Sequence, residues 1–432
     1  MFETIKNAWK VVDIRKKILF TLFIVIIYRL GGFIPVPFLD PTAVAEMISG
    51  GNSVFSTLNL FSGGTFSRAT LMCLSISPYI NAQIIIQLLT FAIPYLERLA
   101  KDGGEEGREK LDKITKYTTL AIALFQSWAY YLTLKNSGSL TYTEGFSKVM
   151  AEIVIILSFT AGAMLVIWLG AQIDRKGIGN GISILLFAGI IANLPPQFGE
   201  TFSTLAKTGN FWYIILIPIM IVLFVLMIAF IIFMDNAERR IPIQCAKRVV
   251  GRKIYGGQST YLPIKIAMAG VLPIIFAMSF LSIPQTIEMF TGEPKAGTFW
   301  YGFMRAFSQT SPIYATLYFV LIIIFSYFYV SMQYNPVEIA NNLRQNNGGV
   351  PGIRPGKPTS DYITRILSKL ILVGALFLGI VALFPIIFAQ VTKVQAVALG
   401  GTSILIVVSV ALETVRMLES QLMMRHHKGF LE

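Results

Sequence analysis

The sequence predicts an all-α polytopic membrane protein. Of its 432 residues, 54% are hydrophobic and only 14% are charged. A soluble protein cannot bury that much apolar surface, so large apolar patches would face water. The hydrophobic residues gather in runs of roughly 20, the length of a helix that crosses a bilayer. The runs lack the alternating polarity of barrel strands, so helices are the expected spanning elements.

The N-terminal region predicts a retained first span. Residues 1–17 are basic and lead into an apolar stretch, as in a signal peptide, but this stretch contains Arg29 and no small-residue cleavage site. We therefore expect a span at 18–36. A shorter apolar run at 182–194, which ends at Pro195-Pro196, also counts as a span. Further runs predict spans at 117–134, 151–171, 211–234, 262–286, 312–333, 368–389 and 401–418.

One apolar segment, residues 58–93, is too long for a single span, since it would measure about 54 Å as a helix. Gly63-Gly64 and Ser77-Pro78 interrupt it. We predict a re-entrant half-helix at about 58–69 and a full span at about 75–93, which brings the total to ten spans. A broken helix at membrane depth needs protein or water to satisfy its backbone, so the interruption indicates an internal cavity.

Lysine and arginine residues indicate the orientation of the spans. Of 36 such residues, 28 fall on one set of connecting segments and termini, six on the opposite set, and two within apolar runs. Basic residues concentrate on the cytoplasmic side, so both termini are expected in the cytoplasm. The three longer hydrophilic stretches, 95–116, 235–261 and 335–367, share that side. The net charge of +13 therefore reflects topology.

The ten spans divide into an N-terminal half at 1–205 and a C-terminal half at 206–432. Each half carries five spans, so equivalent spans run in opposite directions, as in inverted repeats. The halves show no convincing sequence identity. We expect two pseudo-symmetric inverted five-helix halves, the first with the half-helix and the second with the cytoplasmic loops at about 235–261 and 335–367.

The groups needed for catalysis are scarce. Both histidines, His426 and His427, lie in the C-terminal tail, which excludes a serine–histidine pair or a histidine-bound zinc in the spans. There is no phosphate-binding loop, and Cys73 and Cys245 lack metal-binding spacing. We expect no catalytic residue, no metal and no cofactor. Ion coupling is disfavoured too, because the deepest acid, Glu413, lies near a predicted span end.

Three features of the sequence are distinctive. The first is Asn59-Leu-Phe-Ser-Gly-Gly-Thr-Phe-Ser-Arg-Ala followed by Ser77-Pro-Tyr-Ile-Asn-Ala-Gln-Ile-Ile-Ile-Gln-Leu-Leu-Thr. The second is Gly177-Ile-Gly-Asn-Gly-Ile-Ser. The third is a pair of loops with Arg239-Arg-Ile-Pro-Ile-Gln and Val350-Pro-Gly-Ile-Arg-Pro-Gly. In this order and on these sides, they closely resemble the bacterial SecY family, the central subunit of the Sec protein-conducting channel (translocon).

The resemblance implies a plug, a half-helix that blocks the pore from the external side. By themselves, Gly63 and Gly64 indicate a kink or a tight helix contact, because glycine lets backbones approach closely. The same property suits an element that must move and repack. The implied plug residues are Asn59, Leu60, Phe61, Ser62, Gly63, Gly64, Thr65, Phe66, Ser67 and Arg68.

Two pairs of branched apolar residues, each four apart on one helix face, indicate ordinary packing when taken alone. The resemblance places them on a ring at the constriction of an hourglass pore. Such side chains close around an extended polypeptide, resist wetting by ions and offer no hydrogen bonds. Leu186 stands where isoleucine is common in the family, a change that should preserve the seal. The implied ring is Ile80, Ile84, Ile182, Leu186, Ile275 and Ile406.

The basic cytoplasmic loops are positive-inside anchors on charge alone. Two Pro-Gly-type turn elements would, however, hold Arg354 on a stiff loop tip. By resemblance, the loops dock the SecA motor ATPase or the ribosome. Arg252 and Lys253 suit the phosphates of ribosomal RNA, and Arg354 would engage the motor. The implied docking residues are Arg239, Arg240, Lys247, Arg248, Arg252, Lys253, Arg354 and Lys357.

The resemblance implies a channel that translocates unfolded secretory polypeptides across the cytoplasmic (inner) membrane and releases hydrophobic segments laterally into the lipid bilayer. Its lateral gate would lie between the span at 75–93 and those at 262–286 and 312–333. SecE- and SecG-like membrane subunits are implied as partners. SecA or ribosomal elongation would supply the energy, so we expect no enzyme in this chain.

Two alternatives belong to other functional classes. A secondary transporter with inverted repeats would need an ionisable or polar substrate site at the midplane, where the resemblance places an aliphatic ring. A lipid scramblase would need a hydrophilic groove along one helix.

Overall fold

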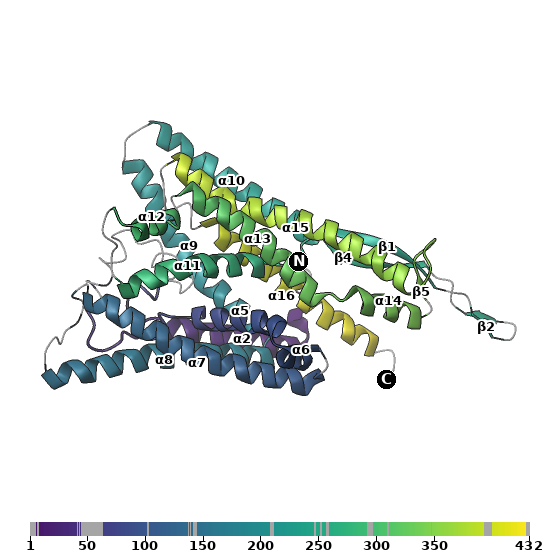
Figure 1. Ribbon diagram of the computed structural model, residues 1–432, viewed down its shortest axis with the longest axis horizontal. Coiled ribbons are helices and arrows are strands. Elements are labelled where there is room, and N and C mark those ends of the chain that lie inside the picture. The colour runs from purple at the N-terminus through teal and green to yellow at the C-terminus, as the bar shows by residue number, and fades with distance from the viewer. Residues whose placement is uncertain are drawn as a thin grey trace. The chain divides into compact units, whose positions relative to one another are not determined.

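The computed structural model (Figure 1) describes residues 8–40, 64–101, 103–136, 145–207, 211–245, 248–250, 253–255, 259–291, 297–308, 311–346, 348–392 and 400–428, and the single residues 6, 42, 44, 138 and 140. The chain is predominantly helical. Its helices are α2 (Val12–Gly31), α5 (Ser77–Ala92), α6 (Pro94–Lys101), α7 (Gly104–Asn136), α8 (Gly145–Lys176), α9 (Gly181–Lys207), α10 (Phe211–Asn236), α11 (Leu272–Thr291), α12 (Phe299–Ala306), α13 (Pro312–Gln333), α14 (Pro336–Gln345), α15 (Lys357–Thr392) and α16 (Gly400–Lys428). Its strands are β1 (Glu238–Cys245), β2 (Arg248–Val250), β3 (Lys253–Tyr255), β4 (Ser259–Lys265) and β5 (Gly348–Gly349).

The chain forms two compact units. The first comprises Met1–Thr208, Leu281–Ser311 and Val410–Glu432, and the second comprises Gly209–Phe280 and Pro312–Ser409. Helices α2 and α5 to α9 belong to the first unit, and α10, α13 to α15 and the strands to the second. The division into halves at 1–205 and 206–432 stays a prediction.

Helix α8 shows how the first unit is packed. Ile155, Phe159 and Ala163 recur every four residues along one face and are fully buried, which is the pattern of a helix face turned to a core. This face belongs to a cluster with Tyr130 and Leu134 of α7. In the second unit, α15 packs against α13, α14 and α10.

Each of the ten predicted spans coincides with a helix over most of its length. Among the described residues, four helical segments are long and apolar enough to cross a membrane: Phe146–Lys176, Pro218–Asn236, Pro312–Gln345 and Lys357–Gln390. A bent pair, Ser77–Ala92 with Pro94–Ala100, makes a fifth if it counts as one span. A multi-pass membrane chain is therefore supported, and the number ten stays a prediction.

Two helix ends were predicted wrongly because of proline. The first span was predicted at 18–36, but α2 ends at Gly31, because Gly31 and Gly32 are poor helix formers and Pro35 and Pro37 then favour extended backbone at Ile34 and Val36. The span at 182–194 was predicted to stop at Pro195-Pro196, yet α9 continues through both prolines to Lys207. A proline removes one backbone hydrogen bond and bends a helix, and within a membrane bundle it need not end it.

The half-helix predicted at about 58–69 is absent from its described part. Residues 66–69 form turns, and residues 58–63 lie outside the described residues. Gly64 and Ala69 have φ of +82° and +47°, which a right-handed helix does not admit. A backbone hydrogen bond with the segment after α2 stabilises these turns: the Val36 N–H donates to the Ala69 carbonyl (3.0 Å).

The loop strands were not predicted. β1 and β4 form an antiparallel hairpin from Glu238↔Lys265 to Gln244↔Ser259, and β5 adds to the other edge of β1, giving the order β4-β1-β5. Along β1, Ile241 and Ile243 are buried while their neighbours are exposed, the alternation expected of a half-buried strand. β2 and β3 form a separate two-stranded ribbon between β1 and β4 in sequence.

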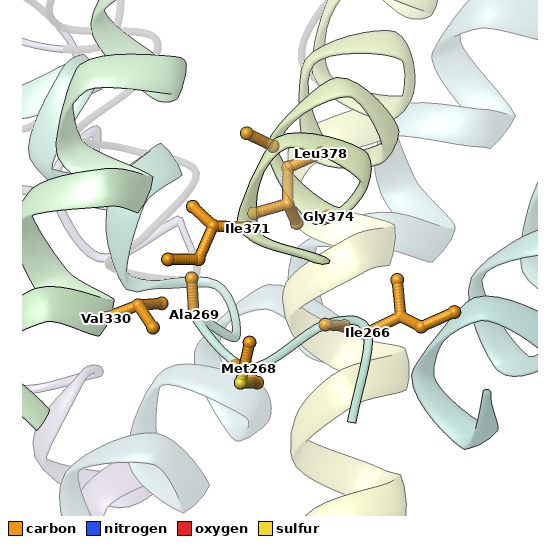
Figure 2. A pocket seen from close by; sticks show the side chains of 9 residues that line it. Ile266, Met268, Ala269, Val330, Ile371, Gly374 and Leu378 are labelled. Carbon is orange, nitrogen blue, oxygen red and sulfur yellow. The ribbon is translucent and has the colours of Figure 1, made fainter. Parts of the chain in front are cut away.

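The span predicted at 262–286 starts later than expected, because its first residues belong to β4 and to turns at 266–271. Gly270 has φ of +59°, and α11 begins at Leu272 with Pro273 in its first turn. Figure 2 shows this turn against α15, beside an apolar cavity of about 10 Å³. A side-chain carbon at Gly374 would lie 2.6 Å from the Ile266 carbonyl oxygen, so glycine lets the turn touch α15.

Candidate functional site

The described part of the predicted plug is fixed in the core of the first unit. Thr65 and Phe66 are buried, and Phe66 lies against Tyr130 of α7 with ring centroids 4.4 Å apart. The Tyr130 hydroxyl donates to the Phe66 carbonyl (3.3 Å), and the Thr65 hydroxyl donates to the Met72 carbonyl (3.2 Å). Gly64 to Arg68 therefore belong to an anchored segment. Asn59, Leu60, Phe61, Ser62 and Gly63 lie outside the described residues.

This anchored segment, residues 64–76, continues to the start of α5. Ser75 has φ of +47°, strained for a residue with a Cβ, and its hydroxyl shares a buried 3.0 Å hydrogen bond with the Tyr28 hydroxyl of α2. Any side chain at Gly162 of α8 would overlap the Leu71 carbonyl oxygen. The segment therefore contacts α2 through Ser75 and α8 through Leu71.

The structure brings three predicted ring residues together. Ile80 of α5 and Ile182 and Leu186 of α9 belong to one apolar cluster in the first unit. Ile84, one turn after Ile80, is also buried. In the second unit, Ile275 of α11 and Ile406 of α16 are buried as well.

The Gly177–Ser183 motif forms the turn that positions α9. Gly179 has φ of +82°, and the Asp174 carboxylate accepts from the Gly181 N–H (2.7 Å). Asn180 caps α9, because its side-chain oxygen accepts from the Ser183 N–H (3.2 Å). The Ile178 N–H donates to the Thr21 hydroxyl of α2 (3.1 Å). These bonds fix the first turn of α9, and with it Ile182 and Leu186.

Gly181→Ala is expected to destabilise the protein, since its methyl group would overlap the carbonyl oxygen of Gly170 and push α9 away from α8. Overpacking of this kind costs about 1–3 kcal/mol. Gly199→Ala on the same helix is the matched control, because among the described residues no atom outside the neighbouring helix backbone lies within 4 Å of the added carbon, and alanine favours helix. Thermal unfolding in detergent measures both. An unfolding temperature for Gly181→Ala equal to that of Gly199→Ala would contradict the proposed contact.

The docking residues predicted in the loop at 235–261 lie on strands wherever the structure describes them. Arg239 and Arg240 are exposed on β1, and Arg240 Nε donates to Glu238 Oε1 (2.7 Å). Arg248 opens β2 and Lys253 opens β3. The remaining two, Lys247 and Arg252, lie outside the described residues.

The second loop holds Arg354 on a tight, defined turn. Gly352 and Gly356 flank it with φ of +80° and +100°, a conformation that only glycine adopts without strain. The hydroxyl of buried Thr359 donates to the Arg354 carbonyl (2.9 Å), so the backbone is held while the side chain is exposed. Lys357 is exposed at the first position of α15.

The two loops are joined through the sheet. Gln244 pairs with Gly349 and Cys245 with Gly348, so the β1 arginines and the Arg354 turn belong to one folded platform. A side-chain carbon at Gly348 would lie 3.1 Å from Ile243 Cγ2, so a larger residue there would require Ile243 to shift by a few tenths of an ångström. Sequence reasoning missed this pairing. The alternation of Ile241 and Ile243 with Arg240 and Gln244 was a signal for strand β1, but it did not indicate the partner strand.

The chain was compared with known proteins. The sequence model of the family described as SecY matches residues 70–415. The Protein translocase subunit SecY of Bacillus subtilis (strain 168) is 41% identical over 439 residues, covering 100% of both chains. The chain belongs to the SecY family. The match to the Bacillus subtilis subunit covers the whole chain. These matches give no support to the secondary transporter.

Solved structures share the fold. This SecY-family chain superimposes on the structure described as a protein conducting channel with a TM-score of 0.64 and 18% identity, covering 94% of this chain and 92% of the other. It superimposes on Sec61 in the canine ribosome-channel complex from the endoplasmic reticulum with a TM-score of 0.62 and 19% identity, at the same coverage. The helical membrane-channel architecture expected from the sequence is confirmed.

Proposed function

We propose that this chain is the channel subunit of a protein translocase, which passes unfolded secretory polypeptides across the cytoplasmic membrane and releases hydrophobic segments sideways into lipid. The observation that carries this function is the full-length identity of 41% with a protein translocase subunit. The channel fold of the structural relatives supports it.

The proposed constriction consists of Ile80, Ile84, Ile182, Leu186, Ile275 and Ile406. The clustering of Ile80, Ile182 and Leu186 supports a common site for the α5 and α9 residues. An aliphatic ring excludes ions by remaining dry, and it offers an extended chain no hydrogen bonds that would hold it. Such a ring passes many sequences, as a general export channel must.

The proposed plug moves only in part. Its described residues, Gly64 to Arg68, begin the anchored segment, whose buried hydrogen bonds oppose displacement. Glycine with φ of +82° suits a pivot, since it has no Cβ to restrict rotation.

The proposed docking surface is the platform of the β4-β1-β5 sheet and the Arg354 turn. The structure of Sec61 comes from a canine ribosome-channel complex, which supports a ribosome as one partner of this chain. Exposed arginines suit the phosphates of ribosomal RNA and the acidic groups of a motor protein. We include SecA as the motor and SecE- and SecG-like subunits as membrane partners.

The proposed topology places both termini and the docking platform in the cytoplasm. The 28 to six partition of lysine and arginine supports it, because positively charged segments stay on that side. The ten-span arrangement in two inverted halves at 1–205 and 206–432 belongs to the same proposal.

Reconstitution tests the channel function. Proteoliposomes with this chain and its small subunits, supplied with SecA, ATP and a secretory precursor, are expected to protect the precursor from external protease. Vesicles without the chain are the control. Protection that is equal in both, or accumulation of a small solute driven by an ion gradient, would overturn the function.

The same vesicles test the lateral gate. Cysteines near Ile86 of α5 and Ser282 of α11, in a background without Cys73 and Cys245, are expected to form a disulfide that stops translocation until it is reduced. A disulfide needs Cα atoms within about 7 Å, so neighbouring pairs are included. Failure of every pair to cross-link, or integration of membrane proteins by the cross-linked form, would place the gate elsewhere.

A further inference from the structure

The residue that leads into α5 has an unusual backbone conformation. Ser75 directly precedes Ile76, the N-cap of α5, and its φ of +47° lies in the left-handed region. A residue with a Cβ adopts this region only at a cost, whereas glycine adopts it freely. A return of Ser75 to the right-handed or extended region would redirect the chain just before α5 begins. Other contacts must therefore hold Ser75 in this conformation.

Tyr28 of α2 supplies such a contact. Its hydroxyl shares a 3.0 Å hydrogen bond with the Ser75 hydroxyl, and the two residues are 1% and 2% exposed. Because both hydroxyls are buried, water cannot readily replace this bond when one of them is removed. Helix α2 itself packs closely on the same segment, since a side-chain carbon at Gly31 would overlap the Met72 side chain. The hydrogen bond therefore joins Ser75 to a helix that is already in contact with its segment.

The start of α5 lies beside the proposed constriction. Tyr28 and Ile80 belong to one apolar cluster with the ring candidates of α9. The Ile80 N–H donates to the carbonyl of Ile76 (3.1 Å), so Ile80 belongs to the first turn of α5. A change of backbone conformation at Ser75 would therefore move Ile80 relative to α9.

We propose that Tyr28 is a positioning residue of the closed channel. Its hydroxyl holds Ser75 in the left-handed conformation and thereby fixes the direction in which α5 starts. The strain at Ser75 favours a second arrangement of α5 as soon as the bond is lost. The positioning of α5 stands on these contacts alone, whereas its effect on ion conductance rests on the proposed function, in which Ile80 and Ile84 belong to the ring.

The distance between two spin labels measures the position of α5. Leu88→Cys on α5 and Leu157→Cys on α8 carry the labels, since both positions are exposed. The full chain is studied in lipid vesicles with Cys245→Ser, and Cys73 stays because it is buried. Tyr28→Phe removes the hydroxyl and keeps the aromatic side chain. We expect it to populate a second distance about five-fold more than the parent, which corresponds to about 1 kcal/mol, the contribution of one hydrogen bond.

Substitutions at Ser75 separate the backbone strain from the hydrogen bond. Ser75→Ala and Ser75→Gly both remove the hydroxyl, but only glycine adopts the left-handed backbone without strain. Ser75→Ala should populate the second distance as Tyr28→Phe does, and Ser75→Gly at least about three-fold less. Ser127→Ala is the matched control, because it breaks a buried 3.0 Å hydrogen bond with the Thr160 hydroxyl inside the regular helix α7. This control should give the distances of the parent, and thermal unfolding checks that each variant is folded.

Ion conductance in planar bilayers separates the role of Tyr28 from the proposed ring. A second distance together with raised conductance in Tyr28→Phe supports both. A second distance with the conductance of the parent supports the positioning role and rejects Ile80 and Ile84 as ring residues. The distances of the parent in Tyr28→Phe, or equal populations in Ser75→Ala and Ser75→Gly, would overturn the role of Tyr28 whatever the conductance.

Discussion

Arg354→Glu is expected to abolish SecA-driven export while the protein stays folded and inserted. The side chain is exposed on the docking platform, so reversing its charge costs the isolated fold little. A negative charge there would repel the acidic groups that the arginine is proposed to bind. Export falls by at least about ten-fold if the lost contact and the new repulsion together exceed about 1.4 kcal/mol. Protease protection of a precursor and thermal unfolding are measured on the same preparation.

Two further variants separate docking from loop structure. Arg365→Glu makes the same charge reversal at an exposed position on α15, and export should stay near the parent level. Thr359→Val removes the hydroxyl that donates to the Arg354 carbonyl and keeps the shape of the side chain, so a partial loss is expected. Export by Arg354→Glu at the parent level would show that this turn does not engage the motor.

Ile406→Asn is expected to open the channel to ions and to precursors with defective signal sequences. Ile406 is 1% exposed in the structure, and a buried amide without partners destabilises the closed state by about 1–3 kcal/mol. That corresponds to a rise of about 5–150-fold in the open population. Ion conductance in planar bilayers and export of a defective-signal precursor measure the change. Ile275→Asn on α11 should act in the same direction.

Controls on the same helix distinguish a pore residue from a packing residue. Ile406→Val keeps the site apolar and should leave conductance unchanged. Leu405→Asn places the same amide at a neighbour that is equally buried, but about 100° around the helix. Leu405→Asn should lower the unfolding temperature and leave the ion conductance unchanged. Equal ion conductance of Leu405→Asn and Ile406→Asn would indicate that Ile406 is an ordinary packing residue and not a pore residue.

Local patterns predicted most of the helical framework. The span expected at 312–333 is α13, Pro312–Gln333, and the span expected at 211–234 lies within α10, Phe211–Asn236. Both are uninterrupted apolar runs, so their length alone sets their limits. The spacing of four predicted only that the two residues of each pair share a helix face; the ring itself was implied by the resemblance and stays a prediction.

Features that depend on distant residues were not predictable. The turns at 66–69 pair with residues near Pro35, and the late start of α11 follows from the pairing of β4 with β1. Around 266–271 the local sequence is apolar, so composition alone favours helix, whereas Ser67 and Arg68 make 66–69 mixed in polarity. The bend at Ile93 was also missed, although Pro94 follows it and residues before proline favour extended backbone.

By itself, the sequence determined the membrane class, the approximate positions of the spans, the charge asymmetry and the membership of the SecY family. These properties follow from the polarity and spacing of residues that are close in sequence. They can therefore be predicted without the tertiary contacts of each segment. Only the tertiary structure decided that the Arg354 turn and the β1 arginines share one platform. That decision depends on the pairing of Gln244 with Gly349, more than 100 residues away. Backbone hydrogen bonds between strands carry no signature in side-chain order, so a two-residue strand of glycines is recognisable only once its partner is in place.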